Sequence, residues 1–332
     1  MLRLAMYVAA VMAAARGRRG RLARARGRDW LGWRGRLVLL AWAAASAFAA
    51  ELPLTGIAHI GFAVSDLEKA RGFYTGVLGY EQAFEIKRPD GSVEMAFFKV
   101  NDTQYIELSP GLKPETDDRL THIAFETSDI ARLRQALERA GVKVPPKPGR
   151  GRDGNQNFSV RDPDGHRVEF VQYMPGSWHW NARGKFQSGR RLSDHMFHLG
   201  ITVASLDAGM HFYGDIFGFR EIWRGGPRDN ELRYINMRMP GAPRGDYIEF
   251  MLHDKPPTRQ QLGSMHHLCL EIPDGTIQQA YKKAVEHGAP AERSQPHIGR
   301  NGRWLMNLFD PDGTRTELME THTVREPATY KP

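Results

Sequence analysis

Residues 58–64 read AHIGFAV, and residues 198–203 read HLGITV. In each stretch bulky apolar residues occupy every second position, and a histidine followed by small residues occupies the positions between them. In the first stretch the bulky residues are Ile60, Phe62 and Val64, and the residues on the other face are His59, Gly61 and Ala63. Alternation with a period of two predicts β-strands. The bulky face would pack against a helix. The histidine face is lined with small residues, which leaves room beside the histidine for a ligand.

The histidine is the first member of a series that occurs twice along the chain. A glutamate, a second histidine and a second glutamate follow it, each in a short apolar stretch. The first series is His59, Glu107, His122 and Glu169, and the second is His198, Glu249, His267 and Glu317. The separations are 48, 15 and 47 residues in the first series and 51, 18 and 50 in the second. Since the step from His to His nearly equals the step from Glu to Glu, we interpret the chain as four copies of one unit.

Each unit is predicted to contain a strand, a helix and about three further strands. Residues 65–68, Ser-Asp-Leu-Glu, have the form of a capping box with Ser65 at the cap. Tight turns are predicted at residues 162–165 and 310–313, both Asp-Pro-Asp-Gly, directly before the strands that carry the last glutamates.

Two domains follow from these units, over residues 51–173 and 196–322. Residues 174–195 form the linker between them, and residues 323–332 form a C-terminal tail. The linker contains the cluster Trp178-His179-Trp180. Packing of the linker is the simpler interpretation of this cluster, and covering the mouth of a site is the alternative.

The net charge of +8 is concentrated in the first fifty residues, which hold ten arginines and one acid, so residues 51–332 sum to about −1. An apolar run after Arg36 ends at the small residues Ala47-Phe-Ala49, which predicts a signal peptide over residues 1–50 and export to the periplasm or the exterior. The run is too short to span a bilayer well, so no stable membrane anchor is expected after cleavage. The lone Cys269 excludes an intramolecular disulfide, and the near-neutral mature chain disfavours nucleic-acid binding.

The eight repeated residues are candidate metal ligands. Neutral imidazoles and carboxylates together suit a divalent ion such as Zn, Ni, Mn or Fe(II), and they leave positions for water or substrate. A single His or Glu on a strand is usually structural, but matching residues on matching faces at eight places favour a metal site. The pairing is left open. The ligands converge either from the two units of one domain or from units of different domains, which would join His59 and Glu107 to His267 and Glu317.

On these residues the chain resembles the vicinal oxygen chelate superfamily, which includes glyoxalase I, extradiol dioxygenases, fosfomycin-resistance proteins and bleomycin-binding proteins. The motifs similar to those of glyoxalase I, in order, are His59-Ile-Gly-Phe-Ala-Val-Ser-Asp-Leu67, Phe73-Tyr74 with Val77-Leu78-Gly79, Tyr105-Ile-Glu-Leu108, Thr121-His-Ile-Ala124, and Asp162-Pro-Asp-Gly165 with Val168-Glu169. The likeness covers roughly residues 55–173 and 195–321. It implies an α+β fold of two glyoxalase-like domains, each made of paired βαβββ modules that form a cup-shaped mixed sheet. It also implies that all eight repeated residues occupy metal-ligand positions.

The sequence departs from these relatives at several positions. Glyoxalase I carries an arginine for glutathione four residues after its first histidine, where this chain has Ala63 and Thr202. It carries an asparagine four residues after its first glutamate, where this chain has Gly111 and His253. Asn307 stands where extradiol dioxygenases have a tyrosine. We therefore expect an enzyme that does not depend on glutathione.

The leading interpretation is a metal-dependent lyase or isomerase that acts on a small oxygenated substrate chelated through neighbouring oxygens. Glu169 and Glu317 are the candidate catalytic bases. The first alternative is an Fe(II) extradiol-type dioxygenase for a catechol-like substrate, with His198, His267 and Glu317 as ligands and His297 as an acid–base residue. The second alternative is a small-molecule-binding protein without catalysis. The sequence leaves a homodimer open.

Overall fold

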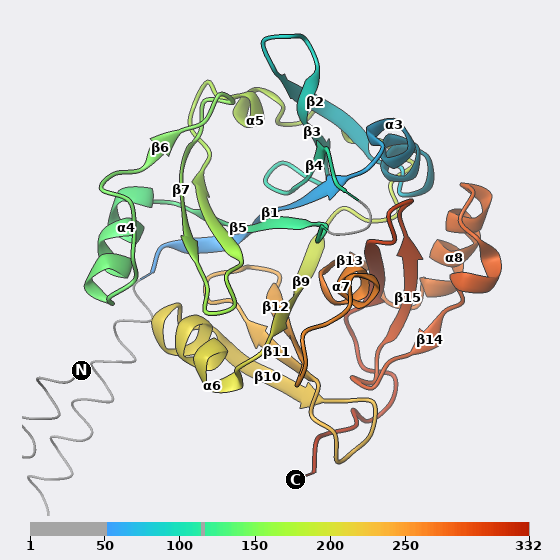
Figure 1. Cartoon of the computed structure of the whole chain (residues 1–332). Coiled ribbons are helices and arrows are strands. Elements are labelled where there is room, and N and C mark those ends of the chain that lie inside the picture. The colour runs from blue at the N-terminus through green and yellow to red at the C-terminus, as the bar shows by residue number, and fades with distance from the viewer. Residues whose placement is uncertain (1–51, 114–116, 332) are drawn as a thin grey trace, which may run out of the picture. The chain divides into compact units, whose positions relative to one another are not determined.

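The computed structural model describes residues 52–331 apart from residues 114–116 (Figure 1). The predicted signal peptide over residues 1–50 lies outside the described residues. Within the described part of the chain, no helix has both the length and the apolar character needed to cross a membrane.

Two mixed sheets of eight strands each form the framework. The strand order is β2-β3-β4-β1-β5-β8-β7-β6 in the first sheet and β10-β11-β12-β9-β13-β16-β15-β14 in the second. The first sheet contains β1 (Leu54–Val64), β2 (Glu81–Lys87), β3 (Val93–Lys99), β4 (Tyr105–Pro110), β5 (Leu120–Thr127), β6 (Gly149–Arg150), β7 (Gln156–Arg161) and β8 (Arg167–Gln172). The second contains β9 (Met196–Val203), β10 (Arg220–Gly225), β11 (Tyr234–Arg238), β12 (Tyr247–Leu252), β13 (His267–Ile272), β14 (His297–Ile298), β15 (Trp304–Phe309) and β16 (Arg315–Glu320). Each sheet curls into a half-barrel, so the expected α+β fold of two cup-shaped domains is confirmed.

The two units of one domain pair through their first strands. β1 runs antiparallel to β5, with Gly61 opposite His122, and β9 runs antiparallel to β13, with Gly200 opposite His267. β1 is also parallel to β4, and β9 is parallel to β12. Of the two pairings that the sequence left open, the structure has the one within a domain, and the pairing across domains is wrong.

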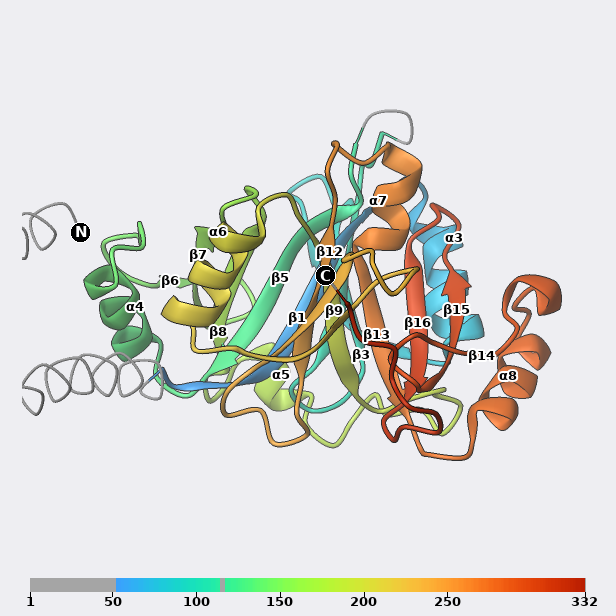
Figure 2. The same cartoon turned by 90° about the horizontal axis from the view of Figure 1, so that it is seen from below.

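The helices are short. They are α3 (Leu67–Arg71), α4 (Ile130–Arg139), α5 (Trp178–Asn181), α6 (Leu206–Gly209), α7 (Arg259–Met265) and α8 (Ile277–Glu286), with π-helical turns η1 (Gly72–Val77) and η2 (Met210–Ile216) and a 3₁₀ turn η3 (Ala291–Arg293). In two perpendicular views α4 and α6 lie on one side of the molecule and α3 and α8 on the other (Figures 1 and 2). Each side therefore carries helices of both domains. On the second side, the His287 ring Nδ1 lies 3.0 Å from the carbonyl oxygen of Val77.

The bulky apolar faces of the sheets pack into one core that both domains share. Phe62 of β1 and Ile201 of β9 are fully buried in the same cluster. Phe125 of β5 meets Phe219 of the second domain edge-on, with 5.5 Å between the ring centroids. Full burial of a side chain of this size contributes about 1.5–3 kcal/mol. Because alternate residues of a strand point to opposite faces, the histidine faces of β1 and β9 point away from this core.

The two Asp-Pro-Asp-Gly turns contact the opposite domain. The Tyr213 hydroxyl of η2 donates to Asp162 Oδ2 at 2.9 Å, and the Tyr74 hydroxyl of η1 lies 3.5 Å from Asp310 Oδ2. All four residues are buried. The turn that precedes the last strand of each domain thus also joins that domain to its neighbour.

Ser65 takes part in the same interface. Its hydroxyl and its backbone N–H donate to the carboxylate of Asp312 at 2.6 and 2.9 Å. Helix α3 is capped by Asp66, whose carboxylate accepts the N–H groups of Glu68 and Lys69. The predicted capping box with Ser65 at the cap is therefore wrong, because a residue distant in sequence binds the Ser65 side chain.

Candidate metal centres

A glycine lies between two candidate ligands in the first sheet. Gly61 on β1 is opposite Glu107 on β4 and opposite His122 on β5. A Cβ atom on Gly61 would lie 2.3 Å from Cε1 of His122, whereas ordinary contact begins at 3.4 Å. The absence of a side chain at Gly61 is therefore what allows the His122 ring to lie across β1.

The second sheet repeats this arrangement more tightly. Gly200 on β9 is opposite Glu249 on β12 and opposite His267 on β13. A Cβ atom on Gly200 would lie 2.0 Å from both Cε1 and Nδ1 of His267. The small residue that the sequence placed on each histidine face makes room for the second histidine of the same domain.

We call the site of His59, Glu107, His122 and Glu169 cup A. Nε2 of His59 lies 3.5 Å from Oε1 of Glu107, and Nε2 of His122 lies 3.2 Å from Oε2 of Glu107. Ligand atoms of His59, His122 and Glu169 lie within 4.8 Å of one another. Metal–ligand bonds of about 2.0–2.2 Å separate the donors of one ion by roughly 3–4.4 Å. The four residues of cup A are thus close to the spacing of a coordination shell.

The electrostatics of cup A suit a cation. Burial lowers the pKa of His59 to about 3, so its imidazole is neutral and can act as a ligand. Neither ring nitrogen of His59 has a hydrogen-bond partner within the described chain. Burial raises the pKa of Glu169, although the guanidinium of Arg167 contacts its carboxylate. A metal ion would give the unprotonated one of these two nitrogens the partner that it lacks.

Cup A is narrow. It borders a cavity of about 130 Å³ that is lined by all four candidate ligands and by His179. His179 belongs to the short linker helix α5, whose Trp178 and Trp180 are exposed while His179 is buried. The structure therefore places one member of the linker cluster in the wall of a site and leaves the other two outside.

We call the site of His198, Glu249, His267 and Glu317 cup B. The Nε2 atoms of His198 and His267 lie 3.1 Å apart, and Oε2 of Glu249 lies 3.4 Å from His267 Nε2 and 3.9 Å from His198 Nε2. Ligand atoms of His198, Cys269 and Glu317 lie within 4.8 Å of one another. Burial lowers the pKa of both histidines well below its usual value and raises the pKa of Glu317 to about 7. Cup B therefore combines neutral imidazoles with a carboxyl group that can exchange a proton near neutral pH.

Arg315 is a further charged group in cup B. Its Nη2 lies 2.8 Å from Nδ1 and 2.9 Å from Nε2 of His267, and its Nη1 lies 3.7 Å from Oε2 of Glu317. Its Nε is buried without a hydrogen-bond partner among the described residues. The four ligand-type residues fit a metal ion by donor type and spacing, but an ion bound to His267 Nε2 would displace the guanidinium from this position.

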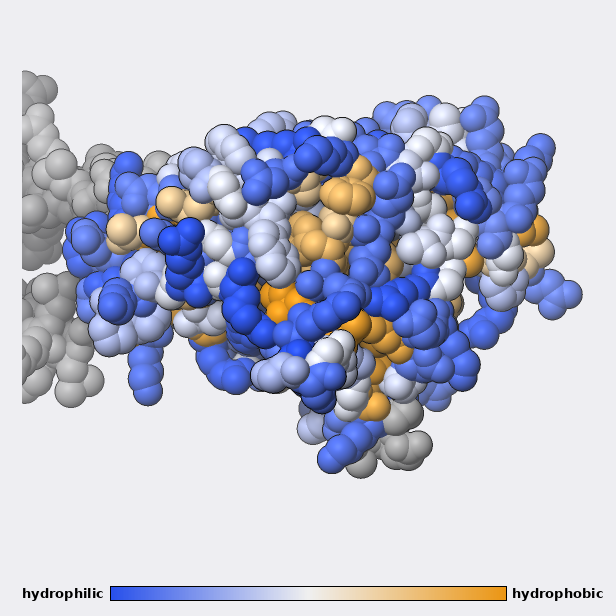
Figure 3. Space-filling view, turned by 90° about the horizontal axis from the view of Figure 1, so that it is seen from above, coloured by the Kyte–Doolittle hydropathy of each residue, from blue (hydrophilic) through white to orange (hydrophobic). Residues whose placement is uncertain are grey.

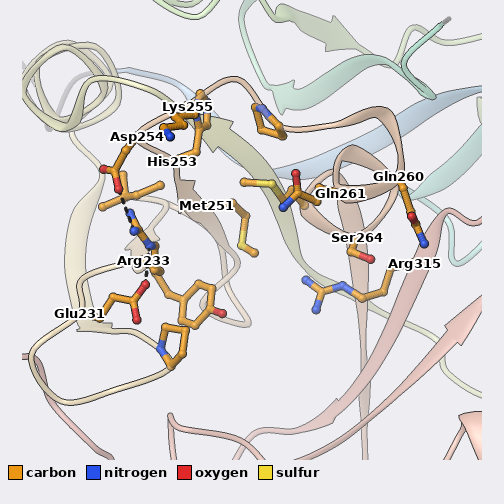
Figure 4. Close-up of a pocket in the computed structure, with 15 residues that line it drawn as sticks. Glu231, Arg233, Met251, His253, Asp254, Lys255, Gln260, Gln261, Ser264 and Arg315 are labelled. Atoms are coloured by element: carbon orange, nitrogen blue, oxygen red, sulfur yellow. Dashed lines mark hydrogen bonds and ion pairs between the residues drawn. The ribbon is translucent and has the colours of Figure 1, made fainter.

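Arg315 also lines a cavity of about 730 Å³ beside cup B. Figure 4 shows Arg315 and Ser264 on one side of this cavity and Arg233 on the other. Arg233 forms ion pairs with Glu231 and Asp254 at 2.9 and 2.8 Å. Arg315 is thus the residue that connects the open cavity with the buried ligand set.

The structure brings together the four predicted ligands of each domain, whereas the other predicted residues lie outside these two sets. His253 lines the 730 Å³ cavity. His297 is exposed on the edge strand β14 and is not part of the cavity lining, so its acid–base role stays a prediction without support from its position. Asn307 is opposite Glu317 in the sheet, with its side-chain oxygen buried and unpaired in the described chain.

Sequence reasoning missed the two arginines. Arg167 and Arg315 each stand two residues before the last glutamate of their series, on the same strand. Residues separated by two positions share a face of a strand, so the alternation that located the glutamates also places these arginines beside them.

Comparison with known proteins agrees with the geometry. Residues 56–170 and 195–318 match the family described as the Glyoxalase/Bleomycin resistance protein/Dioxygenase superfamily. A lactoylglutathione lyase of Neisseria meningitidis is 30% identical over 125 residues, which are 36% of this chain and 91% of that protein. A lactoylglutathione lyase of Arabidopsis thaliana is 24% identical over 277 residues, which are 79% of this chain and 90% of that protein.

Solved structures with a similar fold include homoprotocatechuate 2,3-dioxygenase from Brevibacterium fuscum. One such structure has a TM-score of 0.59 and 19% identity, and the match covers 82% of this chain and 74% of the other. Another, a complex with 3,4-dihydroxyphenylacetate, has a TM-score of 0.58 and 18% identity over 84% of this chain and 85% of the other. At this identity the likeness shows the fold alone.

Proposed function

Since the chain belongs to the glyoxalase/bleomycin resistance protein/dioxygenase superfamily, we propose that cup B is the active site of a divalent-metal-dependent lyase or isomerase. Its substrate is a small oxygenated molecule that chelates the metal through neighbouring oxygens and carries no glutathione. Glu317 is the residue that takes a proton from carbon and returns it.

The position of Glu317 is the observation that carries this proposal. Its side chain is buried, and before a metal binds, burial raises its pKa to about 7. A bound metal would lower that pKa, so the carboxylate would be ionised and available as a base. Its carboxylate lies in the same cluster as the ligand-type nitrogen of His198. Proton transfer would therefore take place next to the metal-binding donors.

The other residues of cup B would hold the metal and orient the substrate. Nδ1 of His267 lies 3.0 Å from the carbonyl oxygen of Met265 and 2.8 Å from Nη2 of Arg315. Once the guanidinium has moved away, the Met265 carbonyl can accept the Nδ1 proton, and Nε2 would be the ligand atom that faces His198 and Glu249. When bound, the metal would polarise the chelating oxygens of the substrate and stabilise the negative charge that develops on them. The guanidinium of Arg315, repelled by that ion, would turn into the cavity, where it can pair with an oxygen of the substrate.

The size of the adjoining cavity favours cup B over cup A as the site of turnover. About 730 Å³ is within the range of small-molecule sites, whereas about 130 Å³ in cup A is well below it. Tyr234 and Met251 add apolar surface to the lining. A substrate that combines a chelating head with a short apolar body fits this composition.

The domain interface supports independence from glutathione. Thr202, which stands at one position where glyoxalase I has its arginine, is buried and lies 3.0 Å from Nε2 of His266 and 3.1 Å from Nε2 of His166. The other such position, Ala63, offers no charge. Thr202 serves the interface between the domains, and neither position supplies a cation for the carboxylates of glutathione.

Solvent-deuterium exchange tests the proposal without knowledge of the natural substrate. Protein loaded with Zn, Ni or Mn is incubated in D₂O with hydroxyacetone, dihydroxyacetone or methylglyoxal, with and without glutathione, and exchange next to the carbonyl is followed by NMR. We expect exchange without glutathione, and we expect Glu317→Gln to reduce it by roughly 100-fold or more.

Glu169→Gln is the matched variant, because it changes the equivalent residue of cup A. Exchange that is lost with Glu169→Gln and retained with Glu317→Gln would place the chemistry in cup A and contradict the proposal for cup B. Oxygen uptake with catechol by Fe(II)-loaded protein, without exchange, would instead support the dioxygenase alternative. Absence of both activities with metal bound in cup B would contradict the proposal and favour a binding protein.

A further inference from the structure

The linker helix α5 contributes a side chain to cup A that neither half of the family match contains. The matched ranges are residues 56–170 and 195–318, and His179 lies between them. His179 lines the 130 Å³ cavity together with the four ligand-type residues. Figure 3 shows the face of the molecule on which α5 and the β2–β3 hairpin lie in Figure 1, with apolar side chains gathered inside a hydrophilic rim.

The position of the His179 ring is fixed by aromatic neighbours. It is 3% exposed. It stacks on Tyr173 with 4.9 Å between centroids and 26° between planes, and it meets Tyr105 edge-on at 4.5 Å. Phe84 and Phe97 contact it edge-on as well. A ring enclosed on this many sides keeps one orientation.

Asn155 decides which ring nitrogen of His179 carries the proton. Its Oδ1 accepts the backbone N–H of Met174 at 3.0 Å, so its Nδ2 must be the atom that faces His179 and Asp153. Nδ2 donates to Asp153 Oδ2 at 2.6 Å and lies 2.8 Å from Nδ1 of His179. Since an amide nitrogen only donates, Nδ1 of a neutral His179 accepts, and the ring proton is on Nε2.

Nε2 of His179 has no partner. The atom is buried, and no hydrogen bond to it exists within the described residues. In the other neutral tautomer, Nδ1–H would face Asp153 Oδ2 at 3.2 Å but would also oppose the N–H groups of Asn155 Nδ2 at 2.8 Å. With the ring proton on Nε2, a buried N–H is left without an acceptor among the described residues, and the cavity that His179 lines is that of cup A.

We propose that Nε2–H of His179 donates to an oxygen atom of a small ligand that shares cup A with a divalent metal. The cavity of about 130 Å³ is well below the size of sites that hold drug-sized ligands. The ligand class is therefore a water or hydroxide, or a carboxylate of only a few heavy atoms. The linker between the domains is thus part of the site, and this inference does not depend on the chemistry of cup B.

Two substitutions separate the hydrogen bond from packing. His179→Phe keeps an aromatic ring against Tyr173 and Tyr105 but removes the donor. His179→Gln keeps an N–H donor near the position of Nε2. Trp180→Phe changes the exposed side of the same helix and serves as the control for disturbance of α5. Circular dichroism and thermal melting establish that each variant is folded.

Zinc affinity is measured by titration against a competing chelator, with ring signals of ¹⁵N-labelled histidines as site-resolved probes. His59 and His122 report cup A, and His198 and His267 report cup B. Loss of an outer-shell partner typically weakens metal binding by about 10–100-fold. We expect a loss of that size in cup A for His179→Phe, most of the affinity to be retained in His179→Gln and Trp180→Phe, and cup B to be unchanged throughout.

The same samples, loaded with zinc, are titrated with sodium acetate and with acetamide. Acetate is expected to shift the cup A signals more strongly than neutral acetamide, and His179→Phe is expected to weaken acetate binding by roughly tenfold or more. If zinc affinity in cup A is unchanged by His179→Phe, the inference is wrong. It is also wrong if Trp180→Phe has the same effect, if zinc does not bind cup A, or if the Nε2 signal shows direct coordination in place of a proton. None of these results would affect the proposed function of cup B.

Discussion

Replacing Gly200 with alanine is predicted to remove metal from cup B without changing any ligand. The new Cβ would lie 2.0 Å from the His267 ring, and ordinary contact begins at 3.4 Å, so the ring must withdraw by about 1.4 Å. Metal sites tolerate errors of only about ±0.2 Å in ligand distance. We therefore expect metal affinity in cup B to fall by more than the roughly 100-fold that marks the upper end of outer-shell effects.

Metal stoichiometry and turnover are measured together for Gly200→Ala and for Gly61→Ala, which changes the equivalent position in cup A. Each variant should retain metal in the unaltered cup, and turnover should be lost with Gly200→Ala alone. Gly214→Ala is the folding control, because its Cβ would lie 3.7 Å from its nearest neighbour. Two bound metals and unchanged affinity in Gly200→Ala would refute the argument that the glycine makes room for the imidazole.

Three further predictions follow from single residues. Burial raises the pKa of Asp310 to about 6, so the stabilisation present below its ordinary pKa of 3.8 is lost as pH rises through 6. Between pH 4 and pH 8, the free energy of unfolding of Asp310→Asn in urea should therefore rise by up to ~3 kcal/mol relative to that of the wild type. A parallel pH dependence of the two proteins would contradict this prediction. Arg315→Met should bind zinc in cup B more tightly and raise KM by roughly tenfold or more, and Arg315→Lys should not restore KM, because lysine lacks the forked donor; an unchanged KM would remove Arg315 from substrate binding. The N-terminal sequence of protein recovered after export should begin near residues 49–51, and an intact leader would contradict the predicted cleavage.

The repeat of histidines and glutamates was predictable because strand alternation assigns each residue to a face. Alternation is a local property, and it places His59 and Gly61 on one side of β1 whatever that strand pairs with. It does not choose between β5 and a strand of the other domain as the partner, because the partner strands carry the same residue types. The choice between the two pairings depends on long-range contacts, which a local sequence pattern does not predict.

Side chains whose partners are distant in the sequence were the other feature that could not be predicted from the sequence. Ser65 has the sequence context of a helix cap, but Asp312, 247 positions away, binds its hydroxyl. His179 lies in a linker without periodicity, and only the folded chain shows that Asn155 and Tyr173 hold its ring in cup A. Arg315, in contrast, lay within reach of the same alternation that located Glu317.

Anomalous diffraction from crystals of protein purified anaerobically and without chelators would test the central claim most directly. We predict a peak between His198, Glu249, His267 and Glu317, with the Arg315 guanidinium turned away from His267, and the absorption edge would identify the metal. A cup B that remains empty after addition of Zn, Ni, Mn or Fe(II), with Arg315 still against His267, would contradict metal-dependent chemistry at this site.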